Sequence, residues 1–164
     1  MELNEELGIK ELEWPGGAMV STEGRSTTEF IEPKPTDIRS CWDKIRPGIV
    51  EILRENSFLT FIPEDVYSEC VNERAFLYTS PVGFLVLTVE VDQFTKDKTL
   101  LLWIAYTYEK GGHEWLAHND WFNDLAMQAG CKYLEARSRV HEMSSYTEKI
   151  GWELDTRIYR KKVV

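Results

Sequence analysis

The stretch TLLLWIAYTYEKGGHEWL, residues 99–116, decides what kind of fold this chain can form. Its first part, Thr99 to Tyr106, is an almost unbroken apolar run, which is typical of a central strand covered on both faces. A loop from Tyr108 to Gly112 follows, and apolar positions then recur at helical spacing from about His113 to Gly130. This order of strand, loop and helix predicts the middle of an α/β domain.

Two helices and two strands are predicted ahead of this stretch. The first helix begins at Asp37, and Pro47 inside it is expected to kink or divide it. The second helix opens at Pro63, with acidic residues in its first turn. β-branched and aromatic residues then predict two antiparallel strands, Ala75 to Thr79 and Val82 to Val91.

Three more elements are predicted after the long helix. They are a short strand from Lys132 to Ala136, a helix around Glu142 to Ile150, and a closing edge strand from Glu153 to Val163. Lysine and arginine residues in the closing strand are typical of a solvated edge, where they oppose pairing with other chains. The whole order predicts an α/β fold with a mixed sheet and helices on both sides. We assign this domain to residues 37–164.

The first 36 residues differ from the rest of the chain. Proline, glycine and a polar run give this segment the composition of an extended N-terminal arm or linker. Leu12 and Trp14 provide an apolar strip in it, and tryptophan is enriched at interface hot spots. We therefore expect Leu12 and Trp14 to bind another protein chain.

Composition excludes several classes of function. The net charge of -9 opposes a nucleic-acid partner. Cys41, Cys70 and Cys131 are far apart and show no CxxC spacing, so neither a disulfide framework nor a metal site is expected. The first residues lack the features of a signal peptide, and no stretch approaches about 18 apolar residues. We therefore expect a cytoplasmic protein that is neither secreted by a signal peptide nor membrane-spanning.

Three segments together carry a family resemblance. TLLLWIAYTYEKGGHEWL, LAMQAGCKYLEARS (residues 125–138) and YTEKIGW (residues 146–152), in this order, resemble the GNAT N-acetyltransferase superfamily. The resemblance covers residues 37–164 and is strongest to the small GNAT-like proteins that tailed bacteriophages encode. It implies a GNAT-like acyl-CoA N-acyltransferase fold, and a location in the host cytoplasm or the virion.

The family holds the pyrophosphate of CoA at a Q/R-x-x-G-x-G/A turn, where backbone N–H groups at a helix N-terminus bind the anion. Residues 108–113 of this chain read Tyr-x-x-Gly-x-His, and a shift by one residue places carboxylates at 109 and 114. Either register disfavours CoA. A lysine in the turn could partly compensate, because its charge pairs with phosphate. The cofactor-binding candidates are Lys110, Gly111 and Gly112.

The family's general acid is also replaced. Aligning the YTEKIGW segment puts Thr147 at the position of the family's tyrosine, and a threonine hydroxyl is too weak an acid for that role. Tyr146 is adjacent, but one helical residue turns it about 100° away. If the chain is an enzyme, Glu109 or the strand-borne Glu90 would activate the amine or a water. Glu90, Glu109 and Tyr146 are therefore the candidate catalytic residues.

Three functions follow from these departures. The leading hypothesis is a non-catalytic GNAT-fold protein of bacteriophage type, a virion or assembly component whose arm contacts phage structural proteins, with no cofactor. The alternative is an acetyl-CoA-dependent N-acetyltransferase with an atypical pyrophosphate loop. A weaker alternative is a phage inhibitor of host defence.

Overall fold

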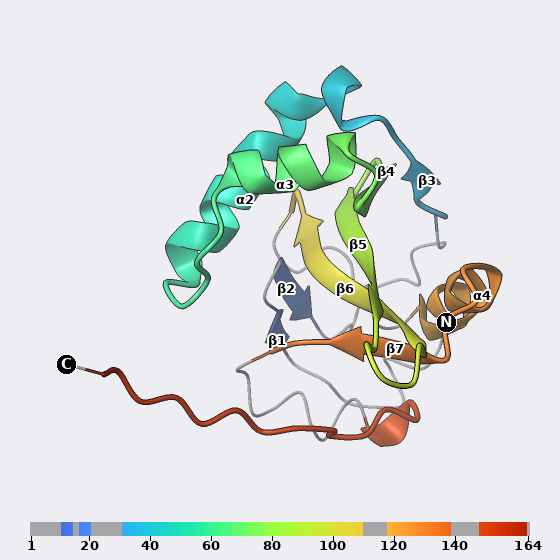
Figure 1. Ribbon diagram of the computed structural model, residues 1–164. Helices are drawn as coiled ribbons and strands as arrows, with labels where there is room; N and C mark the ends of the chain where they lie inside the picture. The colour runs from blue at the N-terminus through green and yellow to red at the C-terminus, as the bar shows by residue number, and fades with distance from the viewer. Residues whose placement is uncertain (1–10, 15–16, 21–30, 110–117, 139–147, 164) are drawn as a thin grey trace.

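The computed structural model describes residues 11–14, 17–20, 31–109, 118–138 and 148–163. Five strands form one sheet in the order β3-β4-β5-β6-β7 (Figure 1). Neighbours from β3 to β6 are antiparallel, whereas β7 lies parallel to β6. The sheet is therefore mixed, as predicted. The strands are β3 (Lys34–Pro35), β4 (Ala75–Ser80), β5 (Gly83–Val91), β6 (Lys98–Thr107) and β7 (Tyr133–Ala136).

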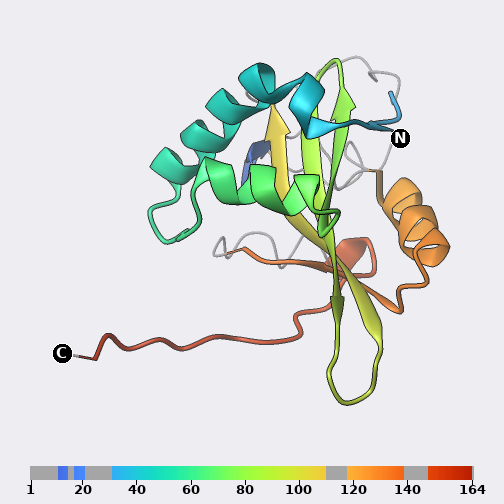
Figure 2. The same cartoon turned by 45° about the horizontal axis from the view of Figure 1, so that its top comes forward.

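Helices cover both faces of this sheet. The short 3-10 helix η1 (Ile38–Ser40), α2 (Trp42–Glu55) and α3 (Pro63–Val71) belong to one face, and α4 (Asn119–Gln128) covers the other. Figure 2 shows α2 and α3 on one side of the strands and α4 on the opposite side. The predicted α/β class with helices on both sides is confirmed.

Two clusters of buried side chains lie on the two faces. The larger cluster joins α2 and α3 to the sheet, and the smaller one joins α4 to the sheet. Because both faces of β5 and β6 are covered, their sequences are nearly continuous apolar runs. The clusters are Ile38, Ile45, Ile49, Ile52, Val66, Ala75, Leu77, Phe84, Val86 and Ile104 toward α2 and α3, and Leu85, Leu87, Leu100, Leu102, Ala105, Phe122 and Ala126 toward α4.

The first predicted helix is divided, but not at Pro47. Pro47 lies inside α2, and the break comes at Cys41, between η1 and α2. Asp37 begins η1, because its carboxylate accepts a hydrogen bond from the backbone N–H of Arg39 at 2.9 Å. The division at the proline was therefore wrong: α2 tolerates the missing N–H of Pro47 without ending.

Gly130 ends α4 as the sequence predicted. Its φ of +68° is in the left-handed region, where glycine carries no Cβ penalty. The N–H of Cys131 donates to the carbonyl of Ala126 at 2.8 Å, and the N–H of Gly130 donates to that of Met127 at 3.0 Å. These two bonds form a Schellman motif. The described part of the helix begins at Asn119, so its predicted start near 113 lies outside the described residues.

The N-terminal segment contains a small hairpin. β1 (Glu11–Trp14) pairs with β2 (Gly17–Val20) in a separate two-stranded sheet, and β2 lies beside β6. Leu12 and Trp14 both belong to β1. Downstream of the hairpin, β3 joins the main sheet by pairing with β4. The division of the chain at residue 36 and the binding of a partner by Leu12 and Trp14 stay predictions.

Deletion of residues 1–30 is expected to leave the melting temperature nearly unchanged. All described members of the two core clusters lie between Ile38 and Trp152, so the deletion removes none of that buried apolar surface. Thermal denaturation followed by circular dichroism measures this. A truncated chain that melts more than about 8 °C lower, a shift worth more than 2 kcal/mol in a domain of this size, would make the segment part of the core.

The predicted closing strand is absent from the described chain. Residues 153–163 form no helix or strand and are exposed along their whole length. In Figures 1 and 2 this segment leaves the domain as an extended tail. Most of the predicted last helix, 142–150, lies outside the described residues. Gly151, which follows it, has a φ of +84°. None of the described helices is long and apolar enough to cross a membrane.

Candidate functional site

The neighbouring parallel strands β6 and β7 separate partway along β6. Their pairing runs from Thr99↔Tyr133 to Leu102↔Ala136. Beyond Leu102, β6 continues to Thr107, and in this part only β5 pairs with it. One edge of β6 therefore presents backbone N–H and C=O groups that no described strand pairs with. We call this opening, lined by residues 103–107 of β6, the fork.

A β-bulge at Trp103 marks the point where the fork begins. Val86 pairs with Ile104, but the next residue, Leu87, pairs with Leu102. Trp103 is therefore an extra residue on β6 without a partner on β5. A bulge bends its strand and ends regular pairing, and bulges are frequent next to active sites. The pairing with β7 stops at the residue before this bulge, so the bulge gives a local cause for the fork.

Tyr106 and Glu51 meet beside the fork. The Tyr106 hydroxyl donates a hydrogen bond to Oε2 of Glu51 at 2.5 Å, which joins β6 to α2. Gly48 lies one helical turn before Glu51, and a Cβ there would come within 2.8 Å of the Phe84 ring and 2.9 Å of the Tyr106 ring. The glycine therefore allows α2 to approach the sheet closely enough for this bond.

The environment of Tyr106 keeps its hydroxyl protonated. Partial burial, followed by the hydrogen bond to the Glu51 carboxylate and the nearby charge of Glu55, raises the pKa of Tyr106 to about 12. At neutral pH the phenol is consequently a donor to Glu51. Its oxygen keeps lone pairs that can accept a hydrogen bond from another group. The pair thus has the elements of a proton relay.

Aromatic side chains surround this pair on the α2 side of the sheet. Tyr106 packs against Tyr108 with ring centroids 6.0 Å apart, and Lys44 Nζ lies 4.6 Å from the centre of the Tyr108 ring. At the bulge, the Trp103 ring meets Phe61 edge to face at 5.2 Å. Burial also raises the pKa of Tyr108. The fork is therefore bordered by half-buried aromatic groups and by the Glu51 carboxylate that Tyr106 bonds.

The loop that follows β6 is described only at its start. Glu109 is exposed and comes two residues after the end of β6, so it lies at the fork end of the strand. Lys110, Gly111 and Gly112 lie outside the described residues, and so does Tyr146. The roles proposed for these residues from the sequence stay predictions.

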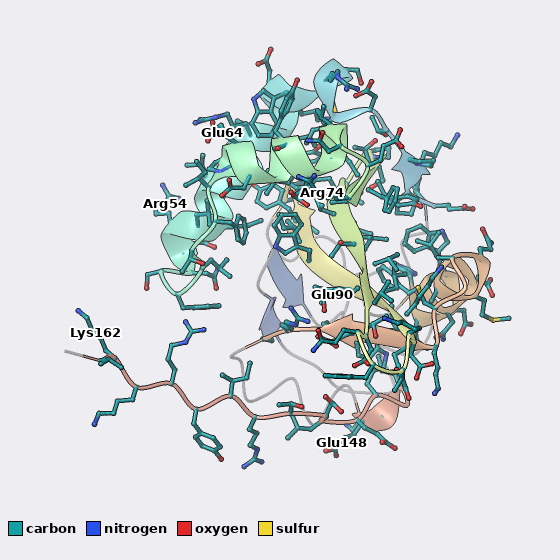
Figure 3. The ribbon with its side chains drawn as sticks, in the orientation of Figure 1. Arg54, Glu64, Arg74, Glu90, Glu148 and Lys162 are labelled. Carbon is teal, nitrogen blue, oxygen red and sulfur yellow. The ribbon has the colours of Figure 1, made fainter. Side chains whose placement is uncertain are left out.

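Glu90 lies at the opposite end of the sheet. It pairs with Thr99 near the start of β6, which puts it about 26 Å along the strand from Thr107 at 3.3 Å per residue. Its carboxylate accepts a hydrogen bond from Arg137 Nη2 at 2.6 Å, and this Arg137 also bonds Glu135. Figure 3 shows Glu90 close to β7. The structure therefore does not bring Glu90 together with Glu109 or with the fork.

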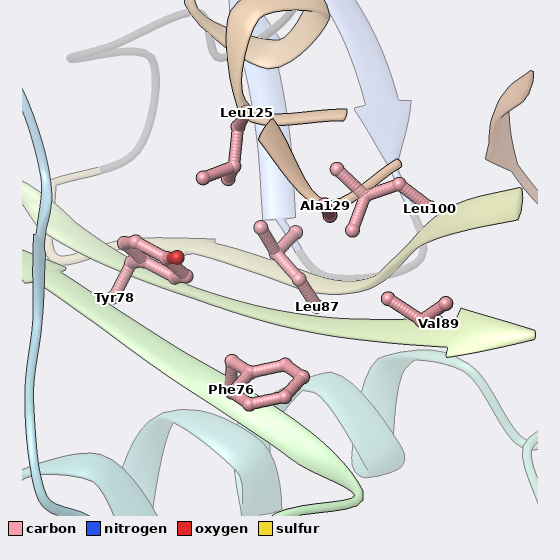
Figure 4. Close-up of a pocket in the computed structure, with 7 residues that line it drawn as sticks. All are labelled: Phe76, Tyr78, Leu87, Val89, Leu100, Leu125 and Ala129. Atoms are coloured by element: carbon pink, nitrogen blue, oxygen red, sulfur yellow. The ribbon is translucent and has the colours of Figure 1, made fainter. Parts of the chain in front are cut away.

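A separate apolar pocket opens between α4 and the sheet. Its volume is about 160 Å³, and Figure 4 shows its lining. The Tyr78 hydroxyl is the one polar side-chain group among the lining residues, so this pocket offers no acid or base pair. It also lies on the face of the sheet opposite to Tyr106. The residues that line it are Phe76, Tyr78, Leu87, Val89, Leu100, Leu125 and Ala129.

The three cysteines do not have the properties of nucleophiles. Burial is the largest cause that raises the pKa of the thiols of Cys41, Cys70 and Cys131, and for Cys70 the value is about 11. A thiol with a raised pKa carries little thiolate at neutral pH, and the thiolate is the reactive form. Nor do the described residues contain a group of histidine, cysteine or acidic side chains placed to hold a metal ion.

Comparison with known proteins identifies the fold of the chain. Neither a protein-family model nor a curated protein sequence matches the chain. Solved structures do match over most of its length. The chain has the fold of the GNAT acetyltransferases. The phage-specific part of the resemblance stays a prediction.

Three of these structures show the extent of the likeness. A probable acetyltransferase shares 15% identity, with 82% of this chain and 98% of that chain covered and a TM-score of 0.59. A ribosomal-protein-alanine N-acetyltransferase from Brucella melitensis biovar Abortus 2308 shares 15% identity, with 81% and 100% covered and a TM-score of 0.57. Glucosamine-6-phosphate N-acetyltransferase from Arabidopsis thaliana shares 13% identity, with 82% and 99% covered and a TM-score of 0.53. At such identities the likeness establishes the GNAT fold alone.

Sequence reasoning missed the Tyr106–Glu51 pair. The two residues are 55 positions apart, and each was part of an element chosen for its apolar pattern. One signal was present in the sequence: Gly48 is a poor helix former inside a predicted helix. A glycine in such a place indicates close packing against another element. Glu51 lies three residues later, on the same side of the helix.

Proposed function

We propose that the protein is an N-acyltransferase that takes its acyl group from an acyl-CoA bound at the fork between β6 and β7. The observation that carries this proposal is the bulge at Trp103, after which one edge of β6 pairs with no strand that the structure describes. Acyl-CoA supplies an activated thioester and an extended arm that contains two amide groups. An open strand edge binds such amides through its own N–H and C=O groups, as in β-augmentation.

The Tyr106–Glu51 pair supplies the acid–base chemistry in this proposal. The Tyr106 oxygen accepts a hydrogen bond from an acceptor amine at the fork. As the amine attacks, a C–N bond to the acyl carbon forms, the C–S bond breaks and CoA leaves as its thiolate. The amine proton passes to the Tyr106 oxygen while the Tyr106 proton moves to Glu51. Return of that proton through Tyr106 to the thiolate releases the CoA thiol, so the phenol and the carboxylate end as they began. The 2.5 Å bond between Tyr106 and Glu51 supports this route. Proton transfer of this kind contributes typically 10²- to 10⁴-fold in rate.

Two features of the chain bear on how the donor is held. Lys110, Gly111 and Gly112 lie in the loop after β6, from the third residue beyond its end, and would bind the pyrophosphate through a lysine charge and backbone N–H groups. β2 lies beside β6 but is not hydrogen-bonded into the main sheet. An extended arm that binds the β6 edge therefore breaks none of the strand pairings between the described residues.

Titration calorimetry with acetyl-CoA tests the proposal. We expect a dissociation constant in the micromolar range. Lys110→Ala should weaken binding about fivefold, which corresponds to about 1 kcal/mol for one ion pair. Lys96→Ala is the matched control, because Lys96 lies in the β5–β6 turn and its Nζ bonds the carbonyl of Gln93. This variant should bind like the wild type.

The second candidate is the non-catalytic reading, a bacteriophage virion or assembly component that acts through Leu12 and Trp14. The sequence observation in its favour is the histidine at position 113, where the family's turn has glycine or alanine. The same titration separates the two functions. No heat and no thermal shift at millimolar acetyl-CoA would overturn the acyltransferase and leave the protein-binding function.

A further inference from the structure

The C-terminal segment 153–163 carries apolar side chains that the described domain does not cover. Leu154 is 58% exposed, Ile158 is 79% exposed and Tyr159 is 88% exposed. Within this segment the Thr156 hydroxyl donates a hydrogen bond to the Asp155 carboxylate, and this bond ties the segment to no other described element. Clustered exposed apolar groups on a soluble domain mark contact sites. The exposed apolar side chains of this segment therefore indicate that it binds a surface outside the described domain of its own chain.

The sequence of this segment is that of a strand. Leu154, Thr156 and Ile158 alternate with charged residues, so an extended chain places all three on one face. Two of the three are β-branched, which favours strands. Eleven residues, 153–163, have an extended length of up to about 36 Å. The segment has the pattern of an edge strand but no described strand to pair with.

The outer edge of β7 is a candidate partner for the tail, because no strand in the described part of the chain pairs with it. The sheet order ends at β7, whose pairing uses the edge that faces β6. On its other edge, β7 pairs with no strand that the structure describes. The four residues of β7 extend over about 13 Å. Five residues of the tail, 154–158, are long enough to pair along this length. Such an edge is a template for a strand from another chain.

The base of the tail is anchored and directs it away from its own β7. Trp152 packs against the core on the α4 side, and its Nε1–H donates to Oδ1 of Asn119 at 2.8 Å. The tail is thus free only from Glu153 onward. In Figure 1 it then runs away from the sheet, and Figure 3 shows Lys162 far from the helices and strands.

We propose that residues 153–163 pair as a strand with the free edge of β7 in a second copy of the chain. The exchange is reciprocal, so a two-fold axis relates the two copies and closes a dimer rather than an open-ended chain of copies. Charge favours this partner: Arg157, Arg160, Lys161 and Lys162 make the tail basic, although the chain as a whole has a net charge of -9. A basic tail on an acidic body is complementary to a second copy of the same protein.

Analytical ultracentrifugation of the full chain at about 5 to 200 μM tests the dimer. We expect a dimer, and we expect Ile158→Pro to convert it to a monomer. Proline removes the N–H and restricts φ, so it is excluded from the middle of a paired strand. Val163→Pro is the matched control at the far end of the tail and should remain dimeric. Neither change touches the described core, so both variants should fold.

Hydrogen exchange locates the contact. In the dimer, backbone N–H groups of 133–136 and 154–158 should exchange slowly, and Ile158→Pro should accelerate both segments. A wild-type chain that is monomeric at 200 μM overturns the proposal. Slow exchange of the tail in that monomer would mean that the tail pairs with β7 of the same chain. Fast exchange would leave the tail available to a different protein. A dimer that persists in Ile158→Pro also overturns it, because the interface would then lie on another surface.

Discussion

Gly83→Ala is expected to destabilise the domain by about 3 kcal/mol or more, or to prevent the accumulation of folded protein. Gly83 begins β5 and pairs with Thr107 at the end of β6. A Cβ at this position would lie 2.0 Å from the carbonyl oxygen of Tyr106. The obstacle is backbone, so no side-chain rotation relieves it, and β5 must move away from β6. That movement would also displace Phe84, which is fully buried.

Gly130→Ala is the matched control for this substitution. Gly130 has a positive φ of +68°, and a Cβ there would meet nothing within 4 Å. Its replacement should therefore cost only about 1 to 2 kcal/mol, from backbone strain alone. Urea denaturation followed by tryptophan fluorescence compares the two variants. If Gly83→Ala is as stable as Gly130→Ala, the close approach of β5 to the β6 carbonyl is wrong.

Glu51→Gln is expected to lower kcat/KM for amine acetylation about 100-fold. The glutamine side chain is nearly the same size and can still accept a hydrogen bond from Tyr106, but it cannot take up the proton that the relay delivers. Affinity for acetyl-CoA should change little, because Glu51 lies on α2 and not on the open edge of β6. Thiol release from acetyl-CoA, measured with a panel of small amines and peptides, gives the rate.

Two further variants make this test specific. Tyr106→Phe removes the hydroxyl that links the fork to Glu51 and should reduce kcat/KM by a similar factor. Asp43→Asn is the matched control: it removes an acidic charge from the exposed first turn of α2, two turns before Glu51, and should leave the rate within about threefold of wild type. A Glu51→Gln enzyme that keeps wild-type kcat/KM would exclude the relay while leaving acyl-CoA binding at the fork untouched.

The strands of the sheet were largely predictable from sequence. Thr99 to Tyr106 was predicted as the central strand, and β6 extends from Lys98 to Thr107. Lys132 to Ala136 was predicted as a short strand and is β7, one residue shorter. Both succeed because apolar runs bounded by polar residues report burial directly. β3 was missed because two residues, Lys34 and Pro35, carry no periodic pattern.

The candidate site was predictable only in part. The end of β6 and the loop after it were chosen from the sequence as the cofactor site, and this assignment stays a prediction; the fork lies at the same end of β6. The chosen carboxylates were a weaker guide, since Glu90 is near the other end of the sheet and pairs with Arg137. Linear distance along β6 separates Glu90 from the fork, and a sequence pattern gives no measure of that distance until strand register is known.

By itself, the sequence determined the α/β class, the buried central strand and the stop of α4 at Gly130. These features depend on local chemistry, namely apolar periodicity and the backbone freedom of glycine, which neighbouring residues express directly. Tertiary structure alone decided the bulge at Trp103, the meeting of Tyr106 with Glu51 and the departure of the tail from the sheet. Each of these depends on which distant segments pair and in which register, and that is settled by packing across the whole domain rather than by any one stretch of chain.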